Sequence, residues 1–379
     1  MAAGRSAADS TALHAALRSL YRPWLEAAAT EFQRAVLATG LPAPKPDPEA
    51  RPGRCWLFSD GLRFDLAKAL GVRLEKAGLT ADLSWQFSAL PGVTSTAKPA
   101  VSPVAAEVSA ASEFGVSYRG SKVTAEVLRR ALRDAGFAIL QGSDLGDGST
   151  AWTEYGNFDS LGHNQGWRLT QHVAQEIGLL AERIEALLGA GFTEVQVVTD
   201  HGWLLLPGGL DKLELPQHLT DARKGRCARL KVGAATDQPT VPWRFDPEVQ
   251  VAVAPGLGVY VSGQDYEHGG LSLQECVLPV LKVTRAASAA QLELVFKVRW
   301  GGLRCRLEVT QAPAGAVADL RVRAADAATS VAQAAKTLDA QGKASLVVPD
   351  ETREGDAVHM VILSRDGQLL AQQTTTVGG

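Results

Sequence analysis

The chain has 379 residues, of which 46% are apolar and 21% are charged. This composition is typical of a globular protein with a sizeable core, and it excludes both wholesale disorder and a single small module. The 38 Lys and Arg residues against 41 Asp and Glu residues give a formal net charge of −3. Bulk charge therefore does not indicate a non-specific polyanion binder, and any contact with nucleic acid must be local.

The sequence shows no apolar run long enough to span a membrane, and its first residues lack the basic and apolar regions of a secretory signal. Its four cysteines lie far apart, and none forms a CxxC pair. This spacing predicts reduced, buried thiols rather than a disulfide framework or a cysteine zinc site. We therefore expect a cytoplasmic protein with no membrane partner.

The N-terminal segment, residues 1–45, shows helical spacing of apolar residues from Asp9 to Val36, which predicts an amphipathic helical lead. Pro23 lies inside this pattern. It predicts a kink or a division into two helices, because proline removes a hydrogen-bond donor and clashes with the preceding turn. The proline-rich residues 41–53 are typical of an extended linker to the body of the protein.

Residues 46–285 alternate short apolar segments with helical stretches, which predicts an α/β domain built on a doubly wound, mostly parallel sheet. The expected strands are residues 55–59, 82–88, 137–141, 195–199 and 251–255, and the expected helices are residues 62–77, 122–135 and 167–188. Residues 286–379 change to alternating runs such as 292–300, separated by turn signals. This pattern predicts a C-terminal β-sandwich domain whose last strands meet at a Ser-Arg-Asp-Gly turn, residues 364–367.

Acidic residues and histidines gather in short polar segments of the α/β region. Asp60 follows a predicted strand, at the edge where α/β sheets bind ligands, although it could instead cap the next helix. Asp200 and His201 also follow a predicted strand. Three further candidates are Asp159 and His163, spaced by four in a glycine-containing loop, and His268, which precedes two glycines. Taken alone, these last two motifs are weak.

Taken together, three Asp and three His are enough to hold two adjacent Zn²⁺ or Mn²⁺ ions. Two cations a few ångströms apart suit in-line phosphoryl transfer. Residues 90–99 offer three hydroxyls at a sheet edge as candidate nucleophiles, Thr94, Ser95 and Thr96, although such a segment can also be a simple Ser/Thr turn. Lys98 is close enough to contact phosphate, but an exposed lysine with no partner is the preferred interpretation.

The ordered motifs SDG, PGVTST, FDSLGH, TDHG and HGG resemble those of the alkaline phosphatase superfamily. Their surroundings, among them SDGLRFD, LPGVTSTAKPAVSP and HGGLSLQECVLPVL, resemble the PglZ family of BREX phage-defence systems over about residues 54–283. The resemblance implies a metal-dependent phosphodiesterase or phosphatase with two divalent ions, zinc being favoured over manganese. It assigns Thr94 as the nucleophile, places Asp60, Thr94, Asp200 and His201 around one ion, and places Asp159, His163 and His268 around the other.

The resemblance also implies a phosphate-ester substrate, with nucleotides and nucleic acids among the candidates, and other BREX proteins as partners. No arginine clamp for a terminal phosphate is evident, so we expect diesters to be preferred. The basic run 223–231 could line a path for a polyanion, although a solvated face is the more common role of such a run. The alternative function is a non-catalytic or partner-activated scaffold, or a nucleotide-sensing component, of the BREX complex.

Overall fold

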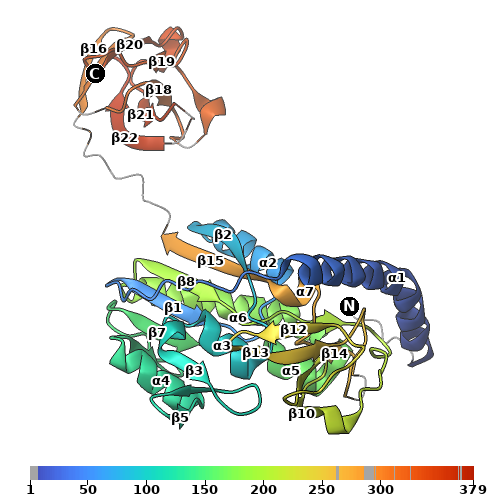
Figure 1. The fold of residues 1–379 in the computed structure, drawn as a ribbon. Helices are drawn as coiled ribbons and strands as arrows, with labels where there is room; N and C mark the ends of the chain where they lie inside the picture. The colour runs from blue at the N-terminus through green and yellow to red at the C-terminus, as the bar shows by residue number, and fades with distance from the viewer. Residues whose placement is uncertain are drawn as a thin grey trace. The chain divides into compact units, whose positions relative to one another are not determined.

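The structure, a computed structural model, describes residues 7–261, 264–285, 294, 296–310, 312–324, 326–365, 367 and 369–379. The chain divides into two compact units, Met1–Arg285 and Ala286–Gly379 (Figure 1). All the residues singled out as nucleophile or metal ligands belong to the first unit.

A six-stranded sheet in the order β2-β15-β8-β1-β7-β6 forms the centre of the first unit. Its strands are β1 (Arg54–Phe58), β2 (Leu79–Phe87), β6 (Ala138–Leu140), β7 (Ala151–Glu154), β8 (Glu194–Val198) and β15 (Val277–Arg285). Strand β1 is parallel to β7 and β8, and β6 is parallel to β7. Strand β15 runs antiparallel to both of its neighbours, β2 and β8. The sheet is therefore mixed, with one antiparallel strand inserted among parallel ones.

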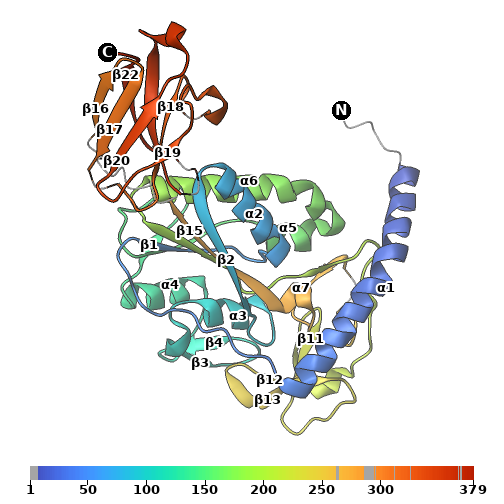
Figure 2. The ribbon, with the colours of Figure 1, turned by 90° about the horizontal axis from the view of Figure 1, so that it is seen from above.

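Successive side chains of a strand point to opposite sides of a sheet, so both faces of this sheet present apolar side chains. Helices cover both faces and bury these side chains. Cys55 and Leu57 of β1 belong to one hydrophobic cluster, and Trp56 and Phe58 belong to another. Helices α2 (Phe64–Lys76) and α6 (Leu169–Gly189) pack on the first face, whereas α3 (Thr94–Val101) and α4 (Ala125–Asp134) pack on the second (Figure 2). The two clusters fix the strand ends of the central sheet between two helical layers.

One predicted strand was assigned to the wrong sheet. Residues 251–255 lie largely in β13 (Asp246–Val253), which belongs to a separate antiparallel sheet in the order β10-β11-β13-β12. The other strands of that sheet are β10 (Thr220–Arg223), β11 (Cys227–Leu230) and β12 (Thr240–Trp243). The apolar run is buried in either setting, so its composition did not distinguish the two sheets. Strands β7 and β15, which were not among the predicted strands, belong to the central sheet.

The N-terminal helix α1 (Ala7–Thr39) is continuous through Pro23, so of the two predicted outcomes, a kink or a division, the division does not occur. The helix axis bends in Figure 1. Leu25 and Ala29 pack in a cluster with residues 204–210 and 257–259. Gln33 is buried and exchanges hydrogen bonds with the backbone of residues 254–256. The helix is thus tied to loops next to the candidate site. After it, residues 40–51 form no helix or strand, as expected of an extended linker.

The remaining elements of the first unit are short. They are β3 (Val108–Ala110), β4 (Val116–Tyr118), β5 (Ser121–Lys122), α5 (Phe158–Gln165), β9 (Leu204–Leu205), β14 (Tyr266–Glu267) and α7 (Leu273–Cys276). No helix among the described residues is both long and apolar enough to cross a membrane.

The second unit consists of two antiparallel sheets that share one hydrophobic cluster. One sheet contains β16 (Phe296–Gly301), β17 (Arg304–Val309) and β20 (Lys343–Val347), and the other contains β18 (Val317–Arg321), β19 (Lys336–Thr337), β21 (Ala357–Leu363) and β22 (Leu369–Thr376). Cys305 and Leu307 of the first sheet cluster with Leu320 and Met360 of the second. Asp366 of the predicted hairpin turn, and residues 292, 293 and 295 of the predicted strand 292–300, lie outside the described residues.

Candidate metal centre

The candidate ligands Asp60, Asp200 and His201 meet because they follow neighbouring strands. Asp60 comes just after β1, and Asp200 and His201 come just after β8. These two strands are adjacent and parallel, so their carboxyl ends lie at the same edge of the sheet. Arg63, rather than Asp60, is the N-cap of α2, so the capping role that Asp60 could have had is not the one it takes.

Asp159 and His163 lie on helix α5, not in the loop that the sequence predicted. In a helix, residues four apart share one face, which brings the Asp159 carboxylate and the His163 ring together. His163 Nε2 is 3.4 Å from Asp159 Oδ1. The helix follows β7, the other neighbour of β1, so the pair reaches the same sheet edge as Asp60. Gly162 is required here, because a Cβ at this position would overlap the ring of Tyr266.

His268 reaches the site through a short pair of strands. It directly follows β14, and Glu267 of β14 pairs with Leu204 of β9, just beyond His201 in the chain. The rings of His201 and His268 stack with their centroids 3.7 Å apart and their planes at 6°. This pairing brings two histidines from distant parts of the sequence into contact.

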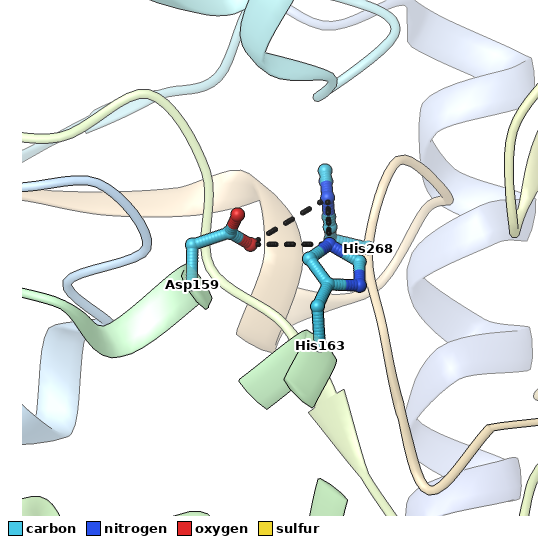
Figure 3. A group of neighbouring side chains, drawn as sticks. All are labelled: Asp159, His163 and His268. Carbon is cyan, nitrogen blue, oxygen red and sulfur yellow. Dashed lines mark hydrogen bonds and ion pairs between the residues drawn. The ribbon is translucent and has the colours of Figure 1, made fainter. Parts of the chain in front are cut away.

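The six side chains form two groups, and the ligand atoms within each group lie within 4.8 Å of one another. In the group Asp159, His163 and His268, the Nε2 atoms of the two histidines are 3.2 Å apart, and His268 Nε2 is 3.7 Å from Asp159 Oδ1 (Figure 3). Figure 3 shows these three side chains converging on one point from α5 and from the segment after β14.

In the group Asp60, Asp200 and His201, His201 Nε2 lies 3.3 Å from Asp60 Oδ1 and 3.8 Å from Asp200 Oδ2. Within the described part of the chain, these two carboxylate oxygens are buried, and Asp200 Oδ2 has no hydrogen-bond partner. A buried carboxylate oxygen is costly unless a cation compensates for it, which a protonated His201 does in the metal-free chain and a bound metal ion would do in its place. His201 Nε2 is also 3.9 Å from Asp159 Oδ1 of the other group, so the two groups adjoin.

The histidine rings are oriented as metal ligands are. His201 Nδ1 is 3.1 Å from the carbonyl oxygen of Gly202, and His268 Nδ1 is 2.9 Å from that of Gly92. A carbonyl only accepts, so Nδ1 must carry the proton and donate it in both bonds. In the neutral ring this leaves the lone pair of Nε2 directed toward the carboxylates, which is the usual arrangement around a bound metal. The donor set of carboxylate oxygens and imidazole nitrogens fits Zn²⁺ and Mn²⁺.

The pKa values of Asp200, His201 and His268 are shifted because these ionisable side chains are buried close together. Burial and the neighbouring Asp60 raise the pKa of Asp200 to about 7. Burial alone would lower the pKa of His201, but the carboxylates of Asp200, Asp60 and Asp159 outweigh it and raise that pKa to about 10. Burial and the charge of His201 hold the pKa of His268 well below its usual value. The group thus retains a proton that a metal ion would displace.

The three candidate nucleophiles have different surroundings. Thr94 is the first residue of α3, and its Oγ1 is 3.4 Å from His201 Nε2. Ser95 is exposed. Thr96 is buried, donates to the carbonyl of Phe114 at 2.8 Å and accepts from Trp243 Nε1 at 3.0 Å. Of the three hydroxyls, that of Thr94 therefore lies beside the ligand groups, and that of Thr96 is engaged elsewhere.

Lys98 and Glu154 form an ion pair at this edge that the sequence did not predict. Lys98 was expected to be exposed without a partner, but its side chain is only 14% exposed and its Nζ is 2.7 Å from Glu154 Oε2. Glu154 is the last residue of β7 and pairs in register with Phe58, the last residue of β1. The same rule that selected Asp60, a polar residue at the end of a strand, would have selected Glu154 had β7 been predicted.

The basic run 223–231 is not a uniformly solvated face. Arg226 is fully buried, pairs with Glu275 at 2.9 Å, and donates to the carbonyls of Gly256 and Gly258. Arg223 donates to the carbonyl of Leu215. These two arginines hold loops of the first unit together.

Comparison with known families agrees with this geometry. No curated protein sequence matches the chain significantly. Residues 49–283 match the family described as "BREX system PglZ alkaline phosphatase-like domain", and the matched region contains both ligand groups, Thr94 and the whole central sheet up to Val283. Because this match covers more than half of the chain, the protein belongs to the PglZ family of BREX systems and carries its alkaline phosphatase-like domain.

Proposed function

We propose that the protein is a two-metal phosphoric ester hydrolase, more active on diesters, which acts in BREX anti-phage defence with Thr94 as its nucleophile. The observation that carries this proposal is the position of Thr94 Oγ1, 3.4 Å from His201 Nε2, where two adjoining ligand groups meet. The proposed ions are divalent, Zn²⁺ being favoured and Mn²⁺ the alternative. Asp60, Asp200, His201 and Thr94 would hold one ion, and Asp159, His163 and His268 the other.

The bound ions would supply positive charge that stabilises the phosphoryl oxygens in the transition state. Thr94 Oγ1 would attack phosphorus in line, forming a phosphothreonine while the ester bond to the departing alcohol breaks. Water would then cleave the phosphothreonine, releasing the phosphate product and restoring the hydroxyl. At the start of α3 the N–H groups of Thr96 and Ala97 donate to the carbonyl of Val93, the N-cap residue. The positive end of the helix dipole at this terminus favours negative charge at Thr94.

The test is metal content followed by hydrolysis. The purified chain should bind two equivalents of Zn²⁺ or Mn²⁺ and hydrolyse an aryl phosphodiester faster than the matching monoester. Thr94→Ala should remove at least about 99% of the rate while the chain stays folded, because covalent catalysis is lost. Ser95→Ala is the matched control and should keep the rate. An active Thr94→Ala variant, or a chain that takes up no metal on reconstitution, would contradict the proposal.

An interaction role within the BREX complex is supported by a separate observation. A pocket of about 390 Å³ is lined in part by Tyr21, Trp24, Phe64 and Leu273, and none of its lining residues is a candidate metal ligand. Trp24 and Leu273 are 57% and 47% exposed, and exposed apolar groups of this size favour contact with another protein. If the Thr94→Ala chain still restricts phage, the scaffold function is favoured over hydrolysis. If the Thr94→Ala chain loses both ester hydrolysis and phage restriction, hydrolysis is the function that defence requires.

A further inference from the structure

A pocket of about 420 Å³ opens directly beside the candidate metal centre. Asp60 and Asp159, one from each ligand group, are among its lining residues. Its other lining residues include Phe58, Lys98, Glu154, Tyr155, Asn157 and Glu176. A substituent on a phosphorus atom held between the two groups has room to enter this pocket, which is large enough for an organic ester group.

The charges in the pocket are unevenly balanced. Among the described residues that line it, Lys98 is the only basic one. Its Nζ lies 2.7 Å from Glu154 Oε2 and 4.4 Å from the centroid of the Phe58 ring, so Glu154 largely neutralises it. A second acid, Glu176, is buried and accepts from the backbone N–H of Asn157 at 3.2 Å. Apart from the candidate metal ligands, the pocket thus holds two carboxylates against one ammonium.

Lys98 and Thr94 belong to the same face of the same helix. They are four residues apart on α3, a spacing that places their Cβ atoms about 6 Å from one another. Any phosphorus atom that Thr94 attacks therefore lies within reach of the electrostatic field of the Lys98–Glu154 pair. Lys98 also acts on the ligands themselves, because its charge favours the ionised forms of Asp60 and Asp200.

From this arrangement we infer that Glu154, through its ion pair with Lys98, determines the preference of the site for diesters over monoesters. The inference rests on the proposed function, because it concerns the substrate class of that site. A monoester carries a second negative charge where a diester carries an ester group. Glu154 cancels the one lysine that could compensate for this charge, and the pocket provides space for the ester group instead. Both residues thus determine specificity, Lys98 through its charge toward the substrate and Glu154 through its ion pair with Lys98.

The test compares kcat/KM for an aryl phosphomonoester with that for the matching methyl aryl phosphodiester, as a ratio for each variant. Glu154→Gln keeps the shape of the side chain but frees the charge of Lys98, and it should raise the monoester-to-diester ratio roughly three- to tenfold. Lys98→Met removes the cation and should lower the ratio by a similar factor. Glu182→Gln is the matched control: Glu182 is exposed on α6 and outside the pocket, and its variant should keep the wild-type ratio.

Metal content and thermal unfolding are measured for each variant, because the ratio is compared only among folded, metal-loaded chains. An unchanged ratio in Glu154→Gln, or shifts of the two variants in the same direction, would overturn the inference. Competition binding of methyl phosphate and dimethyl phosphate to the metal-loaded Thr94→Ala chain gives a second readout that needs no turnover. If the wild-type chain hydrolyses neither ester, the proposed function fails. The binding ratio still decides whether Glu154 discriminates between one and two charges.

Discussion

The rings of His201 and His268 lie face to face, 3.7 Å between centroids, although each belongs to a different ligand group. Two imidazolium rings in such contact would repel each other, so the two histidines cannot readily be protonated together. The carboxylates around His201 raise its pKa to about 10, whereas the pKa of His268 is held well below its usual value by burial and by His201. In the metal-free protein at neutral pH, the His201 ring is therefore protonated on both nitrogens and positively charged, whereas the His268 ring is neutral.

The first prediction concerns protons released when metal binds. A metal ion needs the lone pair of His201 Nε2, so binding near pH 7.5 should release about one proton from the Asp60, Asp200 and His201 group. Because the pKa of His201 is raised to about 10, the metal-free group holds its proton throughout the neutral range, and metal affinity should increase as the pH rises. Titration calorimetry in two buffers of different ionisation enthalpy measures the number released. A binding enthalpy that is the same in both buffers would contradict this assignment.

The control for this measurement is His163→Ala, which changes only the other ligand group. It should weaken binding at that group while the proton release associated with His201 remains. Loss of the release in this variant would mean that the proton comes from the second group.

A second prediction concerns stability. Asp200 is fully buried, and its Oδ2 has no hydrogen-bond partner among the described residues. In the wild-type chain, metal at about 100 times its dissociation constant should stabilise the fold by about 2.7 kcal/mol per site, because it binds the native state alone. Asp200→Asn should remove this gain for one ion while leaving the metal-free chain folded. Thermal unfolding with and without Zn²⁺ measures the difference, and an equal shift in both chains would rule out Asp200 as a ligand.

A third prediction concerns Tyr266, which donates from its hydroxyl to Asp159 Oδ1 at 2.8 Å. This bond orients a carboxylate that would hold the second ion. Tyr266→Phe keeps the buried ring but loses the donor, so the affinity of the Asp159, His163 and His268 group should fall about 10- to 100-fold. Metal titration under competition with a chelator measures this. Arg63 is a matched site for comparison: it stacks on Trp203 and pairs with Asp65 without touching the ligands, so Arg63→Gln should leave the affinity unchanged.

The sequence predicted the parts of the site that obey a local rule. Asp60 and Asp200 each follow a buried strand, so the local pattern placed both at the ligand-binding edge of the sheet, and the family resemblance grouped them around one ion. That their strands are adjacent is shown by the structure. The pairing of Asp159 with His163 was anticipated from its spacing, although the segment is a helix rather than a loop. On a helix a spacing of four places both side chains on one face, so the contact forms although the predicted loop is wrong.

The rest depended on contacts between distant segments. Glu154 escaped notice because β7 is only a four-residue strand of mixed character, and its partner Lys98 lies on another element. Strand β15 continues the apolar run that follows His268, but nothing in its composition shows that it is antiparallel to β2 and β8. Register and direction of a strand are set by its partners, which a local pattern does not contain.

The last prediction separates the two threonines of α3. Thr96 Oγ1 donates to the Phe114 carbonyl and accepts from the indole N–H of Trp243, and both partners are buried. Thr96→Val keeps the volume but leaves these two polar groups unsatisfied, which should lower the free energy of unfolding by about 2 kcal/mol. Because Thr96 does not face the ligand groups, the folded variant should keep its two metal equivalents and its rate. Thr94→Val should show the reverse, with a nearly unchanged unfolding free energy and no hydrolysis. Urea denaturation and ester hydrolysis on the same samples distinguish the two, and a rate lost in Thr96→Val but kept in Thr94→Val would move the nucleophile to Thr96.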